Sequence, residues 1–156
     1  MKIKLIAVGS KMPDWVTQGF NQYTQRMPRD CAVELIEIPL AKRSKNQLAE
    51  QWKDKEGQQI LKAIDATDWV VALEVQGKNW STQQLAGQLT QWQQMGNNVA
   101  LLVGGPDGLS SECLARANSK WSLSALTLPH PLVRVLLAET LYRAWSVTVN
   151  HPYHRE

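Results

Sequence analysis

The sequence has few of the residues that build disulfide frameworks or metal centres. Its two cysteines, Cys31 and Cys113, lie far apart in a chain of 156 residues and lack metal-ligand spacing. A disulfide framework is not expected, so a reducing, cytoplasmic location is the simplest interpretation. The three histidines occupy positions 130, 151 and 154, with no cysteine or carboxylate set at zinc spacing. We therefore expect no metal ion.

Long apolar segments are also scarce. The opening segment MKIKLIAVGS has too short an apolar run for a signal peptide. Arg134, Glu139 and Arg143 interrupt the segment that comes nearest to a membrane span, so no membrane partner is expected. Charged residues make up 20% of the chain and hydrophobic residues 44%, as in ordinary soluble globular proteins. The formal net charge of +3 permits a nucleic-acid partner without requiring one.

Apolar runs alternate with amphipathic segments along the whole chain, without a linker or an internal repeat. Strands are expected at residues 3–8, 33–38, 69–75, 99–103 and 121–126. The first run is apolar at nearly every position, which is typical of a strand buried on both faces. The alternation predicts an α/β fold, with a mostly parallel sheet and helices on both of its faces. The length fits one domain that covers residues 1–156.

Polar residues and a proline predict where several helices begin. Asn46 is a candidate cap for the second helix, and Ser81 with Gln84 matches a capping box for the third. Pro131 is placed in the first turn of the last helix, where its missing N–H group is harmless.

The last helix is apolar on more than one side. Its apolar residues spread well beyond one stripe: Leu132, Val133, Val135, Leu136, Leu137, Ala138, Leu141, Tyr142, Ala144, Trp145 and Val147. Such a helix is buried on more than one side, and in a domain this small we expect the second partner to be another copy of the chain. Glu139 and Arg143 fit either a surface ion pair or a polar contact in that interface.

Two loops of small residues lie within residues 99–134, and each follows an expected strand. One is the glycine turn at 104–108, and the other runs from Ser124 to Pro129. Glycines let a backbone approach a bound molecule closely, and ligands of open α/β sheets bind beyond the carboxyl ends of the strands. By the same rule, Leu73 and Glu74 are placed to line a pocket. Two alternatives stay open: the loops are tight turns that bind no ligand, and Leu73 is an ordinary core residue.

The densest positive run in the chain consists of Lys42, Arg43 and Lys45, grouped around Ser44. A run of this kind can contact an RNA backbone, because phosphate contacts need only well-placed lysine and arginine side chains. A solvated loop explains the same residues, and the two interpretations are equally open at this point.

Several common catalytic patterns are absent from the sequence. The glycine turn GGPDG does not match G-x-G-x-x-G, and no G-K-[ST] follows it, so dinucleotide and P-loop sites are not indicated. The chain also lacks the G-x-S-x-G elbow of α/β hydrolases.

Taken together, the residues resemble a known family over essentially the whole length. The runs WSLSALTLPHPLVRVL and NHPYHRE are its most specific part. Further matching segments are residues 5–9, 11–15, 34–39, 42–43, 54–57, 102–106, 121–135 and 141–156. The chain closely resembles the ribosomal RNA large-subunit methyltransferase H family, within the SPOUT class of methyltransferases.

The resemblance implies a homodimer with a trefoil knot in the carboxyl-terminal half, a feature that general topology rules would not have predicted. It also implies S-adenosylmethionine as the methyl donor, and no metal. The positions that match the family's cofactor site are Leu73, Gly105, Ser124, Ala125, Leu126, Thr127, Leu128 and Pro129. Glu74 stands where the family more usually carries aspartate.

The substrate implied by the resemblance is a pseudouridine in 23S ribosomal RNA, methylated at ring N3 on assembled 70S ribosomes. We expect RNA contacts from Lys42, Arg43, Lys45 and Arg134. Our hypothesis for catalysis uses the tail residues Tyr153, His154 and Arg155, which would reach the cofactor of a neighbouring subunit. His154 would act as base or proton relay, Arg155 would stabilise charge, and Tyr153 would stack or orient. A tail that merely docks on the last helix is the alternative.

Two other functions compete with the methyltransferase interpretation. One is a ribosome-associated binding protein that kept the fold and lost the chemistry, although the intact residues at 105 and 124–129 argue against it. The other is a flavodoxin-like domain that binds a mononucleotide through Gly9, Ser10 and Lys11.

Overall fold

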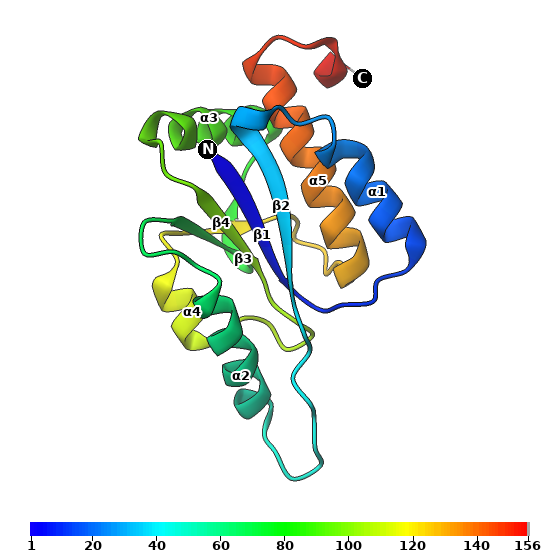
Figure 1. The fold of residues 1–156 in the computed structure, drawn as a ribbon, viewed down its shortest axis with the longest axis vertical. Helices are drawn as coiled ribbons and strands as arrows, with labels where there is room; N and C mark the ends of the chain where they lie inside the picture. The colour runs from blue at the N-terminus through cyan, green and yellow to red at the C-terminus, as the bar shows by residue number, and fades with distance from the viewer. Residues whose placement is uncertain (156) are drawn as a thin grey trace.

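Strands and helices alternate along the chain in this computed structural model, which describes residues 1–155 (Figure 1). The strands are β1 (Lys2–Val8), β2 (Ala32–Ile38), β3 (Trp69–Asn79), β4 (Val99–Val103) and β5 (Ser119–Ser122). The helices are α1 (Asp14–Thr24), α2 (Ala49–Lys62), α3 (Thr82–Met95), α4 (Ser111–Arg116) and α5 (His130–Thr148). Two short 3-10 helices are η1 (Arg29–Cys31) and η2 (Pro152–Arg155).

The five strands form one sheet in the order β2-β1-β4-β3-β5, and every neighbouring pair is parallel. The prediction of a parallel α/β sheet is therefore confirmed. Because all strands run the same way, their carboxyl ends gather along one edge of the sheet. The loops that follow β4, β3 and β5 meet there, since these three strands are neighbours.

Helices cover both faces of the sheet, as the sequence predicted (Figure 1). On β1, the side chains of Ile3 and Leu5 belong to the core beneath α1, α3 and α5. Those of Ile6 and Val8 belong to the second core, beneath α2 and α4. All four are at most 2% exposed, so the alternation of a strand side chain between faces buries β1 from both sides.

Two of the predicted helix starts are confirmed. Ser81 caps α3: its Oγ accepts from the Gln84 amide at 3.1 Å, and the Gln84 side chain accepts from the Ser81 amide at 2.9 Å. Pro131 lies in the first turn of α5.

The predicted cap at Asn46 is wrong. Helix α2 begins at Ala49 after Leu48, whose amide donates to the Gln51 side chain at 3.2 Å. Asn46 lies in the turn that precedes the helix. It is too many residues away from the free backbone amides of the first helical turn for its side chain to reach them.

Strands β3 and β5 differ from their expected lengths. Strand β3 continues to Asn79 past an irregularity, because both Leu73 and Lys78 pair with Trp121. Strand β5 ends early at Ser122. The Ser122 hydroxyl donates to the Ser124 carbonyl at 3.1 Å. Such local side-chain hydrogen bonds compete with the backbone hydrogen bonds between strands and turn the chain away from the sheet.

Arg134 is an interior residue and not a surface cation. Its side chain is 2% exposed, with Nη1 2.7 Å from Glu37 Oε2 and Nη2 donating to the Gly9 carbonyl at 2.7 Å. The guanidinium therefore joins α5 to the end of β2 and to the loop after β1. The prediction that Arg134 contacts RNA is wrong, because the group has no surface from which to do so.

Within residues 1–155, no helix combines the length and the apolar character that crossing a membrane requires.

Replacing Arg134 by methionine tests this interior role. Arg134→Met is expected to lower the free energy of unfolding by about 2–3 kcal/mol, because charged hydrogen bonds to Glu37 and Gly9 are lost inside the protein. Urea unfolding provides the measurement. The exposed Lys45→Met is the control, and its effect should stay within about 0.5 kcal/mol. Equal stabilities of the two variants would contradict the interior role.

Candidate functional site

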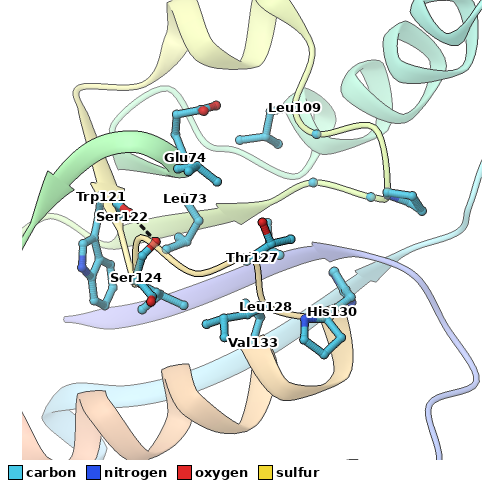
Figure 2. A pocket seen from close by; sticks show the side chains of 18 of the residues that line it. Leu73, Glu74, Leu109, Trp121, Ser122, Ser124, Thr127, Leu128, His130 and Val133 are labelled. Atoms are coloured by element: carbon cyan, nitrogen blue, oxygen red, sulfur yellow. Dashed lines mark hydrogen bonds between the residues drawn. The ribbon is translucent and has the colours of Figure 1, made fainter.

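A cavity of about 470 Å³ opens at the carboxyl ends of three neighbouring strands (Figure 2). Strand β3 supplies one wall, the loop after β4 a second, and the segment between β5 and α5 the third. The lining residues are Leu73, Glu74, Val75, Val103, Gly104, Gly105, Pro106, Gly108, Leu109, Trp121, Ser122, Leu123, Ser124, Leu126, Thr127, Leu128, Pro129, His130 and Val133. Most of them are apolar, and backbone groups and a few polar side chains lie among them. This combination is typical of a site for a small organic ligand.

The glycine loop, residues 104–108, can fold as it does because Gly104 lacks a Cβ atom. A Cβ on Gly104 would lie 2.5 Å from the Gly108 carbonyl carbon, far inside contact distance. The Gly108 amide donates to the Gly105 carbonyl at 2.9 Å, and Gly108 has a positive φ of 85°. These contacts close the loop into a tight turn whose backbone forms part of the cavity wall.

Strand β3 reaches the cavity through its irregular segment. Leu73 is the last residue before the pairing with β5 shifts, and Glu74 and Val75 follow it into the wall. Further along, a Cβ on Gly77 would lie 2.8 Å from backbone atoms of Lys120 and Trp121. Glycine at this position lets β3 rejoin β5 beyond the bulge. Bulges of this kind redirect side chains next to functional sites.

The segment after β5 folds over the cavity through its own serine side chains. The Leu126 amide donates to Ser124 Oγ at 2.9 Å, and the Ser122 hydroxyl donates to the Ser124 carbonyl (Figure 2). These two bonds hold a compact loop from which Thr127 and Leu128 line the cavity. An apolar slot with backbone donors and acceptors at its edge suits a flat heteroaromatic ring.

His130 lies at the boundary between this loop and α5, on the cavity wall (Figure 2). Among the described residues, neither buried ring nitrogen has a hydrogen-bond partner. Burial lowers the pKa of His130, and the nearby charge of Arg134 lowers it further. The ring is therefore neutral at neutral pH, with one donor and one acceptor. Since unpartnered buried polar atoms are costly, His130 is suited to contact a polar ligand group.

The structure brings together the predicted cofactor positions Leu73, Gly105, Ser124, Leu126, Thr127, Leu128 and Pro129, all of which line the cavity. Ala125 does not line it and is exposed, because the turn at Ser124 points it outward. Sequence reasoning missed Leu109, Trp121 and Val133 as wall residues. Their apolar character gave only the signal of core residues: Trp121 begins an expected strand, Val133 lies in the expected last helix, and Leu109 follows the glycine turn.

The predicted catalytic tail lies elsewhere in its own chain. The Tyr153 hydroxyl donates to Glu139 Oε1 at 3.0 Å, and its ring lies 4.7 Å from that of Tyr142. These contacts hold η2 at the carboxyl end of α5 (Figure 1). His130, which lines the cavity, is the first residue of α5, at the opposite end of the helix. A 19-residue helix is about 28 Å long, so His154 and Arg155 lie far from the cavity of their own chain.

The environment of Tyr153 keeps its hydroxyl protonated. Burial raises the pKa of Tyr153, and the hydrogen bond to Glu139 and the charge of that carboxylate raise it further. The phenol therefore acts as a donor at neutral pH and not as a base.

The predicted RNA-binding loop is at the surface, with Lys42 and Lys45 exposed. Arg43 differs from them, because its guanidinium pairs with Glu56 and Asp107. No group of three or more His, Cys, Asp or Glu side chains suited to a metal ion occurs within residues 1–155.

Comparison with known proteins places these features in a family. Residues 1–154 match a family model described as "Predicted SPOUT methyltransferase". The chain is 63% identical over 156 residues to the ribosomal RNA large subunit methyltransferase H of Hahella chejuensis, with all of both chains covered. Its counterpart from a Marinomonas species is 58% identical, with 99% of this chain and 100% of the relative covered.

Solved structures show the same fold at low sequence identity. A structure titled as a probable methylase family protein from Haemophilus influenzae has a TM-score of 0.58 at 16% identity, covering 97% of this chain and 69% of that one. The full-length match to the family model and the two relatives then fix the assignment. The chain belongs to the ribosomal RNA large subunit methyltransferase H family, within the SPOUT methyltransferases.

Proposed function

We propose that the protein transfers a methyl group from S-adenosylmethionine to N3 of a pseudouridine in 23S ribosomal RNA, acting in the cytoplasm on assembled 70S ribosomes. The observation that carries this proposal is the cavity, since all but one of the eight positions matching the family's cofactor site line it. Two relatives of at least 58% identity are named as large-subunit ribosomal RNA methyltransferases, which supports the substrate class.

The cavity fits S-adenosylmethionine by its shape and by the chemistry of its walls. Leu73 and Leu128 supply apolar surface for the adenine ring, and the backbone of residues 124–129 supplies donors and acceptors for its edge. Glycine at position 105 lets the loop pack closely against the protein behind it, because a Cβ there would lie 3.1 Å from a Val8 methyl carbon and 3.2 Å from Glu56 Oε1, while Gly105 itself lines the cavity. When bound, the cofactor supplies an electrophilic methyl group on a sulfonium centre.

A homodimer with antiparallel α5 helices would complete the site. Leu132 and Leu136, one turn apart on α5, are 41% and 39% exposed, which is unusual for leucines on a central helix. Two-fold pairing of two subunits along Leu132 and Leu136 buries both leucines and sets the two α5 helices antiparallel. The carboxyl end of one α5 then lies beside the amino end of its partner. Together with the knot predicted for this half of the chain, the pairing brings each tail to the other subunit's cavity.

The tail carries the groups that methylation of a ring nitrogen needs. N3 of pseudouridine holds a proton, which must leave before or during methyl transfer. His154 would accept or relay that proton, and Arg155 would stabilise the negative charge that develops on the ring. Tyr153 would orient or stack on the base. The rest of the catalytic effect is alignment of donor and acceptor, which the walls of the cavity provide.

The exposed lysines Lys42 and Lys45 would contact RNA phosphates. Phosphate contacts carry no direct sequence information, so the target is selected by the shape of the ribosome around it.

The decisive experiment follows labelled methyl transfer from S-adenosylmethionine to purified 70S ribosomes that lack the modification, with free 23S RNA in parallel. Label at one pseudouridine N3 in ribosomes but not in free RNA is the expected result. Cofactor binding without label in either substrate would mean a different RNA target. Failure of both binding and transfer would leave a non-catalytic ribosome-associated protein.

The glycine loop can be tested with a matched pair of substitutions. Gly104→Ala forces a Cβ against the Gly108 backbone, so binding of S-adenosylhomocysteine should weaken by about tenfold or more. Gly87 lies exposed within α3 with nothing within 4 Å of its Cβ position. Gly87→Ala should leave binding intact and raise the free energy of unfolding by about 0.5–1 kcal/mol. Calorimetry measures the affinity and the stability of the two variants. Equal affinities of Gly104→Ala and Gly87→Ala for S-adenosylhomocysteine would contradict the role of the loop.

The tail can be tested by complementation between subunits. A chain truncated after Asn150, and His154→Ala or Arg155→Ala, should bind S-adenosylhomocysteine normally but lose turnover by about 100-fold or more. The exposed Lys62→Ala on α2 is the control and should keep its activity. Mixed dimers of a truncated chain with a Gly104→Ala chain should regain activity, because one intact cavity then meets one intact tail. Unchanged turnover of the truncated chain would contradict this role.

A further inference from the structure

A cluster of side chains joins the basic loop to the back of the glycine loop, outside the cavity. At its centre is Arg43, whose Nη2 lies 3.1 Å from Asp107 Oδ2 and 3.4 Å from Glu56 Oε2. The guanidinium also lies over the ring of Trp52, with Cζ 5.3 Å from the ring centroid. The indole N–H of Trp52 donates to the same Asp107 oxygen. These contacts join three segments at Arg43: the basic loop, α2 and the glycine loop.

Each carboxylate of this cluster contacts the glycine loop. Asp107 is a member of the loop, between two residues that line the cavity. Glu56 is only 2% exposed, and its Oε1 lies 3.2 Å from the position of a Cβ on Gly105. Its Oε2 accepts from the Ala41 amide at 3.0 Å. The buried carboxylate therefore packs directly behind the part of the loop that faces the ligand.

The cluster depends on the charge and shape of Arg43. A buried carboxylate such as Glu56 needs a positive partner, and Arg43 is the cation within ion-pair distance of it among the described residues. A planar guanidinium can stack on an indole and bond two carboxylates at once, which a lysine ammonium cannot do. Hydrogen bonds from Trp52 and Arg43 also lower the pKa of Asp107, so its negative charge persists into mildly acidic solution.

We propose that Arg43 is a positioning residue for the cofactor: through Asp107 and Glu56 it holds the glycine loop in the conformation that accepts the ligand. The identity of the ligand rests on the proposed function, but the contact itself does not. Arg43 stands among the predicted RNA-binding residues, and the structure gives its side chain a different task. Lys42, its exposed neighbour in sequence, provides the comparison, because it carries the same charge outside the cluster.

The experiment compares Arg43→Gln with Lys42→Gln in the full-length protein, using two readouts that do not depend on turnover. Hydrogen exchange in the ligand-free protein reports on the loop at residues 104–108, and calorimetry gives the affinity for S-adenosylhomocysteine. Arg43→Gln should speed exchange in the loop and weaken binding, each by about tenfold. Lys42→Gln should change neither and should only weaken the interaction with ribosomes.

Two further variants separate positioning from general damage. Arg43→Lys keeps the charge but not the planar fork, so its affinity should fall between those of the wild type and Arg43→Gln. Asp107→Asn should weaken binding, and combining it with Arg43→Gln should add little, because both remove the same contact.

The outcomes distinguish this inference from the proposed function. Wild-type affinity and wild-type exchange in Arg43→Gln would overturn the positioning role and return Arg43 to the RNA contacts. If the wild-type protein does not bind S-adenosylhomocysteine, the proposed function fails. The exchange of the loop then still decides whether Arg43 holds it: faster exchange in Arg43→Gln supports the inference, and unchanged exchange contradicts it.

Discussion

Close approach of backbone to backbone at the carboxyl edge of the sheet is the constraint on which the site depends. At Gly104 and Gly77 a single added carbon would collide with the backbone of a neighbouring segment, at 2.5 and 2.8 Å. The first contact closes the glycine loop, and the second returns β3 to β5 beyond its bulge. With both contacts in place, the glycine loop and β3 form walls of a cavity instead of packing into a solid core. The middle of the sheet supplies the rigid frame, since strands β1 and β4 are buried from both sides.

Two arginines connect this frame to the site: Arg134 in the interior, and Arg43, whose side chain is partly exposed, behind the glycine loop. Arg134 draws α5 against β2 and the loop after β1, and so places His130 at the cavity wall. On the opposite face, Arg43 and Glu56 brace the glycine loop from behind. Both arginines are thus held by contacts within their own chain, whereas Lys42 and Lys45 of the basic loop are exposed.

The sequence was most informative where a local pattern has one structural solution. A nearly continuous apolar run predicted the doubly covered β1, and Ser81 with Gln84 predicted the start of α3. The cavity loops were predicted from glycines and from the family resemblance together. The role of Arg134 was not predictable, because its partners Glu37 and Gly9 lie 97 and 125 residues away in the chain, and only folding reveals that the charge is buried. The same holds for Arg43, whose partners come from two other segments: Trp52 and Glu56 from α2, and Asp107 from the glycine loop.

The most direct test of the account is a crystal structure of the protein with bound S-adenosylhomocysteine. The account predicts the adenine ring between Leu73 and Leu128, with the glycine loop against the ligand and the tail of the other subunit at the mouth of the cavity. The ligand in any other place, such as the hollow lined by Lys11 and Asn21 beside α1, would contradict it. A ligand in the cavity with both tails still docked on their own α5 helices would retain the cofactor site and exclude the shared catalytic centre.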